Sequence, residues 1–210
     1  NHKEILKCTR MIYKFHDCVK NLNYNHMDIK DNSDWIKKLN LDVKNLCDIE
    51  KKILKKFYVD KLDKFYLLNV KRAIHKIINI IKFLEENDFS KYSRNNKIIC
   101  HDSLYYQNFL IKNHKVYIID FGGICINNRI YDLARFARRI FYKNKFDFTI
   151  LNNIYNIYNE LYRFNDFEKF IFCKYLDYPY KFVRLSCKFY LKDTNMKSDK
   201  LFCKFIKYVD

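Results

Sequence analysis

The sequence predicts a mainly α-helical fold that contains one small β-hairpin. Apolar residues recur three and four positions apart through most of the 210 residues, as they do on one face of an amphipathic helix. Two short apolar runs, at 109–111 and 116–119, instead indicate strands joined by a tight turn. Hydrophobic residues make up 49% of the chain, and only two glycines and one proline interrupt it, so a single globular domain is expected.

The periodicity places three helices in the first part of the chain. A first helix is expected over 4–22 and a second over 35–57, with a polar loop at 23–34 between them. Asp60 predicts the N-cap of a third helix, whose buried stripe continues to Leu84. A connection at 87–96 then leads to a short strand at Ile98 and Ile99. His16 and Cys18 of the first helix are expected to be packed or solvated rather than to act as ligands.

The polar residues with the clearest chemical pattern lie between Cys100 and Leu133. His101 is followed seven positions later by Asn108, and the second predicted strand runs into Asp120, Phe121 and Gly122. Proteins that transfer phosphoryl groups hold Mg²⁺ and nucleotide phosphates in place and orient an acceptor hydroxyl. Because oxygen atoms are the ligands that Mg²⁺ prefers, Asn108 and Asp120 are the candidate metal ligands, brought to one edge by the hairpin between them.

Asp132 is the candidate support of this site. It begins the next helical pattern, where a carboxylate can accept backbone N–H bonds and hold the loop that carries His101. Gly122, which completes the Asp-Phe-Gly triplet, is a further candidate for structural support of the site. The set of residues, with hairpin-forming runs between them, predicts a kinase-like phosphotransferase.

Position 103 departs from the kinase pattern. In H-R-D-L-x-x-x-N the third residue is the aspartate that accepts the substrate proton, but here that residue is Ser103. Asp102 is adjacent, although an offset of one residue in an extended loop turns a side chain to the opposite side. Two alternatives stay open: Asp102 substitutes through a shifted loop, or the site binds without catalysing efficiently.

Helical patterns resume after Asp132. Their apolar residues fall at 133–141, 150–161, 167–178, 182–189 and 201–208, and the third helix should stop before Pro179. The polar face of the first of these helices carries three arginines, which are expected to be solvated, with anion binding as the alternative: Arg135, Arg138 and Arg139.

Composition excludes several classes of protein. The net charge is +17, but the basic residues form no dense cluster, so weak attraction to anions is expected rather than a nucleic-acid partner. The glycines are adjacent, which excludes a glycine-rich phosphate loop. Eight dispersed cysteines predict buried reduced thiols rather than a zinc site. The sequence shows no signal peptide and no spanning run, which favours a cytoplasmic protein without a membrane partner.

The central stretch ICHDSLYYQNFLIKNHKVYIIDF resembles the aminoglycoside phosphotransferase superfamily, which shares the C-terminal lobe of protein kinases. With LDYPYKFVRLSCKFYLKD at 176–193 and KFHDC in the first helix, the chain is most similar to the CotS family of spore coat proteins. The resemblance implies one kinase-like C-terminal lobe over 1–210, without the N-terminal nucleotide lobe. Its segments would be a helical part at 1–97, the catalytic loop and metal-site hairpin at 98–132, and a helical part at 133–210.

The resemblance also implies a function. Asn108 and Asp120 would bind Mg²⁺ with ATP, while His101 and Asp132 would brace the loop, and Ser103 would occupy the proton-acceptor position. The chain would act in spore coat assembly in an endospore-forming bacterium of the Firmicutes, first in the mother-cell cytoplasm and then in the coat, with other coat proteins as partners.

Three functions follow from these observations. The first is a coat protein whose kinase-like site is degenerate or binds nucleotide only. The second is an active Mg²⁺-dependent phosphotransferase that acts on a small-molecule hydroxyl acceptor, with Asp102 as the base. The third is a basic adaptor that binds polyanions.

Overall fold

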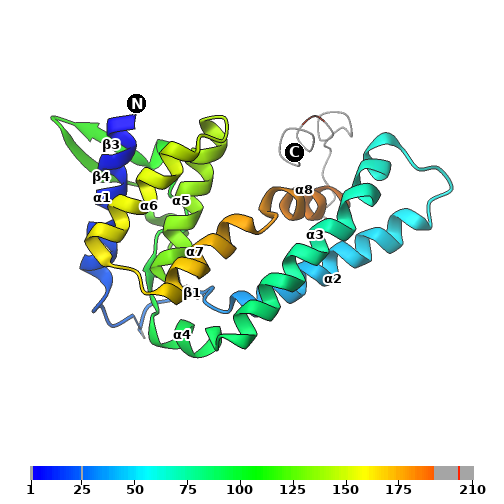
Figure 1. Ribbon diagram of the computed structural model, residues 1–210, viewed down its shortest axis with the longest axis horizontal. Coiled ribbons are helices and arrows are strands. Elements are labelled where there is room, and N and C mark those ends of the chain that lie inside the picture. The colour runs from blue at the N-terminus through cyan, green and yellow to red at the C-terminus, as the bar shows by residue number, and fades with distance from the viewer. Residues whose placement is uncertain (1, 25, 192–202, 204–210) are drawn as a thin grey trace. The chain divides into compact units, whose positions relative to one another are not determined.

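The computed structural model describes residues 2–24, 26–191 and 203 (Figure 1). The described chain forms two compact units, one built from residues 2–34 and 89–176 and the other from residues 35–88 and 177–191. Both are mostly helical, as predicted. The single lobe with its three segments stays a prediction.

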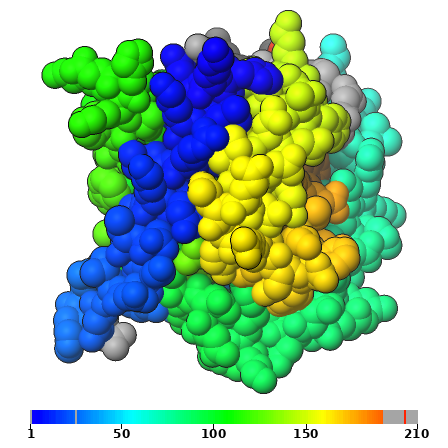
Figure 2. Space-filling view, turned by 60° about the vertical axis from the view of Figure 1, so that its left-hand side comes forward, coloured from blue at the N-terminus to red at the C-terminus, as the bar shows by residue number. Residues whose placement is uncertain are grey.

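The first unit packs around three helices, α1 (His2–Val19), α5 (Arg129–Lys143) and α6 (Phe148–Tyr162). In Figures 1 and 2, α1 lies alongside α6. The apolar stripe of each helix faces this core, where Ile12 and Tyr158 are fully buried. The short helix α4 (Phe89–Asn95) and the helix α7 (Asp166–Asp177) complete the helices of this part of the chain.

Two small sheets lie in the first unit. One has the strand order β1-β5-β2, where β1 (Lys30–Asp31) is parallel and β2 (Ile98–Cys100) antiparallel to β5 (Cys125–Asn127). The other is the hairpin of β3 (Phe109–Lys112) and β4 (Lys115–Ile118), which pairs Phe109 with Ile118.

The second unit is a helical assembly of α2 (Trp35–Leu54), α3 (Lys61–Glu86) and α8 (Tyr180–Tyr190). Asp60 caps α3 in a capping box with Asp63, as the sequence predicts. In the core, the ring of Tyr66 stacks on Phe182 with centroids 5.4 Å apart, and its hydroxyl donates to the Leu46 carbonyl at 2.7 Å.

Most predicted elements are confirmed, and the differences concern short segments. The loop expected at 23–34 contains β1, the connection at 87–96 contains α4, and β5 was not predicted. The helix expected at 201–208 lies outside the described residues.

The prediction of buried thiols is wrong for most of the eight cysteines. All eight are free, but only three are buried: Cys8, Cys100 and Cys125. Among the described helices, none combines the length and the apolar character needed to cross a bilayer.

Candidate metal and nucleotide site

The loop that follows β2 is held by the buried carboxylate of Asp132. One carboxylate oxygen accepts the backbone N–H of His101 at 2.6 Å, and the other accepts that of Asp102 at 3.0 Å. Asp132 lies in the first turn of α5, whose N-cap is Asn128, so the helix fixes its position. Both oxygens of the Asp132 carboxylate therefore bond to the backbone of this loop.

Asn108 and Asp120 meet at the open end of the hairpin. Asn108 precedes β3 and Asp120 follows β4, and the Asn108 backbone carbonyl accepts the N–H of Ile119 at 3.0 Å. The Asn108 side-chain amide donates to an Asp120 carboxylate oxygen at 3.3 Å and to the Ser103 carbonyl at 2.8 Å. The amide oxygen of Asn108 is then the atom that would ligate a cation.

This pair fits Mg²⁺ in its donor chemistry. It offers two oxygen ligands, and Asp120 is exposed, which leaves room for the water and phosphate oxygens that complete the octahedron of this ion. Asp120 has a φ of 67°, in the left-handed region that non-glycine residues rarely adopt. Such strained backbone is common where a functional side chain is aimed.

His101 connects the loop to the strand that leads into Asp120. Its Nε2 is 3.0 Å from the carbonyl oxygen of Ile119, and its ring lies 4.8 Å from that of Phe121. Phe15 of α1 also contacts Phe121, with centroids 5.7 Å apart. These contacts place His101 between the loop and the residues around Asp120, and its bracing role stays a prediction.

Ser103 lies close to the second glycine after Asp120. A Cβ placed on Gly123 would lie 2.9 Å from the Ser103 hydroxyl oxygen, closer than such atoms approach, whereas one on Gly122 would meet its nearest atom, on Asp120, at 3.8 Å. The close approach in this turn therefore falls on Gly123, which the sequence analysis did not single out.

Asp102 is held against α5. It has a φ of 59°, and its Oδ1 accepts the hydroxyl of Tyr131 and pairs with the Arg135 guanidinium at 2.7 Å. Arg135 also donates to the Tyr131 hydroxyl. These partners tie the only carboxylate adjacent to Ser103 to the helix that follows the site.

The arginines of α5 do not form the solvated face that the sequence predicts. Arg135 pairs with Asp102, and the buried Arg138 donates to the Tyr175 carbonyl at 2.9 Å. The Arg139 guanidinium lies 3.5 Å from the ring centroid of Tyr105 in the loop. This prediction is wrong because helical periodicity cannot show that the loop and α7 lie opposite the polar face of α5.

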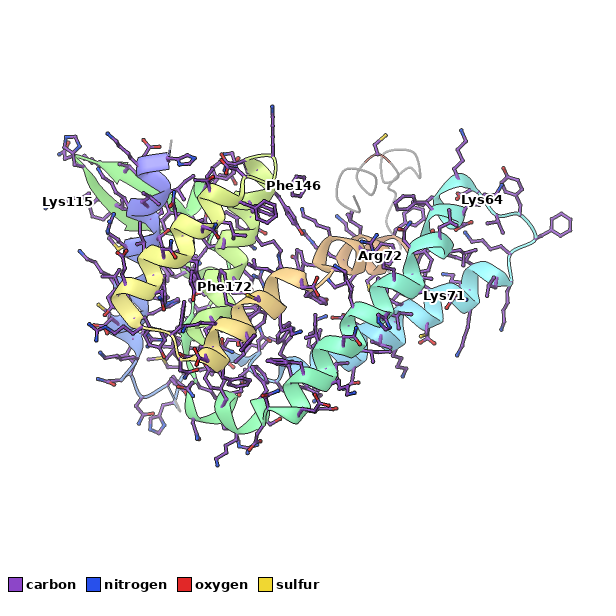
Figure 3. All side chains as sticks on the ribbon, in the orientation of Figure 1. Lys64, Lys71, Arg72, Lys115, Phe146 and Phe172 are labelled. Carbon is purple, nitrogen blue, oxygen red and sulfur yellow. The ribbon has the colours of Figure 1, made fainter. Side chains whose placement is uncertain are left out.

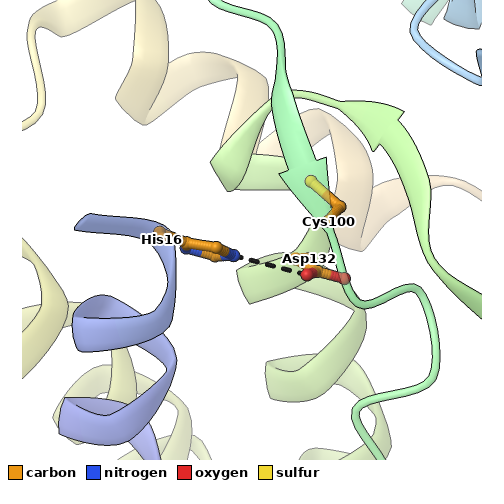
Figure 4. Close-up of side chains that lie close together, drawn as sticks. All are labelled: His16, Cys100 and Asp132. Carbon is orange, nitrogen blue, oxygen red and sulfur yellow. Dashed lines mark hydrogen bonds and ion pairs between the residues drawn. The ribbon is translucent and has the colours of Figure 1, made fainter. Parts of the chain in front are cut away.

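His16 of α1 joins the same network from 116 residues away (Figure 4). Its Nε2 is 3.3 Å from Oδ2 of Asp132, the same oxygen that accepts the His101 N–H, and its Nδ1 is 2.6 Å from the Tyr158 hydroxyl. Of the two alternatives expected for His16, packed or solvated, the structure shows the first, since its side chain is fully buried. A histidine on the apolar stripe of a helix was the available signal, but no pattern identified Asp132 as its partner.

Burial sets the protonation of this pair. Burial lowers the pKa of His16 below its usual 6.5, and this effect outweighs the neighbouring carboxylate. For Asp132, burial alone would raise the pKa, but the bonds from His16 and from the backbone of His101 and Asp102 outweigh it and hold the pKa below the usual range. Both lowered pKa values are explained by a neutral His16 beside an ionised Asp132. In this state Nε2 of His16 donates to the Asp132 carboxylate, and Nδ1 accepts from the Tyr158 hydroxyl.

Cys100 completes a buried cluster with His16 and Asp132, whose potential ligand atoms all lie within 4.8 Å of one another. These atoms already have partners, because the Cys100 thiol is 3.3 Å from the Asn128 carbonyl and both Asp132 oxygens accept backbone N–H groups. Burial and the nearby Asp132 raise the pKa of Cys100 well above 9.0, which favours a thiol over the thiolate that binds metals. The cluster therefore links α1 to the loop, and Asn108 with Asp120 remains the better metal site.

The fold is that of a kinase-like phosphotransferase lobe. Residues 47–168 match the Phosphotransferase enzyme family (APH), and since this is more than half of the chain, the protein belongs to that family. No curated protein matches the chain significantly in sequence.

Two solved structures share the fold. The crystal structure of an aminoglycoside phosphotransferase from Alicyclobacillus acidocaldarius is similar over 99% of this chain and 61% of its own, with a TM-score of 0.85 and 16% identity. The Plasmodium vivax ethanolamine kinase is similar over 100% of this chain and 60% of its own, with a TM-score of 0.57 and 12% identity. The chain thus spans about three fifths of the length of each neighbour.

Proposed function

We propose that this chain is a CotS-like spore coat protein whose kinase-like site binds Mg²⁺ and nucleotide without efficient phosphoryl transfer. Proteins of this fold generally use ATP and Mg²⁺, and Asn108 and Asp120 offer the oxygen ligands for the metal. Bound Mg²⁺ would neutralise the charge of nucleotide phosphates at the end of the hairpin. Support for the coat role is the likeness of the central and C-terminal segments to that family.

The proposal that catalysis is lost rests mainly on the contacts that Asp102 makes with α5. A serine occupies the position of the proton acceptor, so a substitute base would have to be the neighbouring carboxylate. That carboxylate is fastened to α5 by Tyr131 and Arg135. A general base must have an oxygen available to the acceptor hydroxyl, and Oδ1 of Asp102 is already engaged by these two partners.

ATP turnover in three forms of the protein tests this proposal. We expect wild type and Asp102→Asn to be equally inactive, and Ser103→Asp to gain Mg²⁺-dependent turnover, because it places a carboxylate at the expected position. A wild-type activity that Asp102→Asn abolishes would instead establish the second candidate.

That second candidate is a Mg²⁺-dependent phosphotransferase with Asp102 as base and a small hydroxyl compound as acceptor. It is favoured by the intact set of His101, Asn108, Asp120 and Asp132. Release of Asp102 from Arg135 would be required before it could accept a proton, so Arg135→Gln should raise this activity.

A further inference from the structure

The turn between α2 and α3 exposes an unusual group of apolar side chains. Leu54 is 66% exposed, Phe57 109% and Tyr58 77%. A single exposed apolar residue is ordinary on a protein surface, but here three large ones fall within five residues at one convex turn. Their exposure has no role in the candidate metal and nucleotide site, which lies in the other unit.

Lysines surround this group. Six lysines and two aspartates lie between residues 51 and 64, and no arginine does. All six lysines are exposed, and four of them lie on either side of the turn without a role in the contacts at its base: Lys51, Lys55, Lys61 and Lys64. Lys64, near the start of α3, is labelled in Figure 3. Both aspartates are engaged in the capping box of α3, so the turn presents mainly positive charge.

The base of the turn is fixed. Lys56 pairs with Asp63 at 2.8 Å, and Asp63 also accepts the Tyr190 hydroxyl at 3.0 Å. Lys52 donates to the Tyr190 carbonyl at 3.0 Å, which anchors the end of α2 to α8. Two of the six lysines therefore hold the base while the apolar side chains project beyond it.

We propose that the α2–α3 turn is a peripheral docking site for an anionic lipid bilayer. Phenylalanine, leucine and tyrosine side chains partition into the boundary between headgroups and acyl chains, and lysines beside them attract anionic headgroups. A nucleic acid would instead favour a groove that follows its backbone, with stacking faces along it. The turn forms one end of the α2–α3 helix pair (Figure 1), and such an end can meet a flat bilayer but offers no groove along which a nucleic-acid strand could lie.

This inference revises the expectation of no membrane partner. That expectation rested on the absence of a spanning run, and peripheral binding does not need one. The proposal is also independent of nucleotide binding. Asp120→Asn should therefore leave vesicle binding unchanged.

Vesicle sedimentation with the full chain tests the proposal. The probes are vesicles of equal parts phosphatidylglycerol and phosphatidylcholine, and vesicles of phosphatidylcholine alone. We expect binding to the anionic vesicles that weakens with added salt, and roughly fivefold weaker partitioning for each lysine of the turn that is removed. Lys55→Gln with Lys61→Gln is the charge variant, and its matched control is Lys112→Gln with Lys115→Gln, two exposed lysines on either side of the hairpin turn.

Apolar insertion needs its own variants. Phe57→Ser with Tyr58→Ser should abolish most of the binding without changing thermal stability, because both side chains are exposed. Leu41→Ser, at a leucine of α2 that is 52% exposed, is the control and should bind as wild type does. In Phe57→Trp, the indole emission should shift to shorter wavelength when anionic vesicles are added.

Three results would overturn the proposal. They are equal binding to both kinds of vesicle, unchanged binding after loss of Phe57 and Tyr58, and no blue shift in Phe57→Trp. Turn-dependent binding to heparin or DNA of the same strength as to anionic vesicles would replace a lipid site with a general polyanion site.

Discussion

Asp132 is the residue on which the loop of the candidate site depends. It is fully buried, and such a carboxylate is stable only when hydrogen bonds replace the water it has lost. The N–H groups of His101 and Asp102 and the ring of His16 supply those bonds. One side chain thus fixes the backbone on which Ser103 and Asp102 are carried.

Asp132→Asn should lower the free energy of unfolding by about 2–3 kcal/mol. The asparagine NH₂ group would face a backbone N–H that the carboxylate accepted, and that buried N–H would lose its acceptor. Urea denaturation measures this loss. Asp17→Asn, at a surface pair with Lys20 on α1, is the control and should change the free energy by less than about 1 kcal/mol. Equal losses in the two variants would contradict the role of Asp132.

His16 predicts a pH dependence of stability. Unfolded histidine titrates near its usual 6.5, whereas burial keeps His16 neutral to lower pH in the folded chain. Below pH 6.5 the unfolded state therefore binds more protons, and the free energy of unfolding falls as the pH falls, by up to about 1.4 kcal/mol per pH unit. Asp132 adds its own loss only on further acidification, toward and below its usual 3.8, because its folded pKa is lowered.

Urea titrations at a series of pH values measure this slope. In His16→Gln the free energy of unfolding should fall less steeply below pH 6.5, because the contribution of the His16 imidazole is missing. His75→Gln, at an exposed histidine of α3, should keep the wild-type slope. A slope that neither substitution changes would show that His16 does not remain neutral in the folded state.

The hairpin is the element that brings the two proposed metal ligands together. Asn113 and His114 form its turn with φ values of 50° and 61°, as in a two-residue turn of type I′. The lysine at its free end, Lys115, is labelled in Figure 3. Asparagine tolerates this conformation well, whereas histidine is less favoured than glycine.

His114→Gly should raise the free energy of unfolding by up to about 1 kcal/mol, because glycine adopts the left-handed conformation without steric cost. Thermal and urea unfolding both report it. Lys115→Gly, in strand β4, should instead lower stability by roughly 0.5–1 kcal/mol. A loss of stability in His114→Gly would mean that the histidine side chain stabilises the turn.

The elements differ in how far the sequence determines them. The long helices were predicted because their apolar residues repeat with one period over many positions, and the hairpin because two short apolar runs flank a polar turn. β1, of only two polar residues, and β5, of three residues, are held by backbone pairing, which leaves no side-chain pattern. The seven residues of α4 are too few for a clear period.

The candidate site shows the same limit. Asn108 and Asp120 were predicted to meet because a hairpin between two residues fixes their separation, and the loop support from Asp132 was also predicted. The partners of Asp102, Tyr131 and Arg135, were not predicted, because they depend on how α5 packs against the loop. Tertiary contacts of this kind have no signature in the spacing of residues.

At the scale of the molecule, a phosphotransferase fold is combined with a net charge of +17. Lysines contribute most of that charge, and it should favour approach to anionic partners at low ionic strength. The proposed nucleotide site at the hairpin and the proposed bilayer site at the α2–α3 turn are located in different units. Each can be lost without the other.

A thermal-shift titration with Mg²⁺-ATP, on wild type and Asp120→Asn, tests the central claim most directly. A ligand that binds only the folded state at about a hundredfold excess over its Kd stabilises it by roughly 2.7 kcal/mol. We predict that wild type is stabilised only when Mg²⁺ and ATP are both present, and that Asp120→Asn is not. An equal shift in the two proteins, or none in either, would contradict a metal and nucleotide site at Asn108 and Asp120.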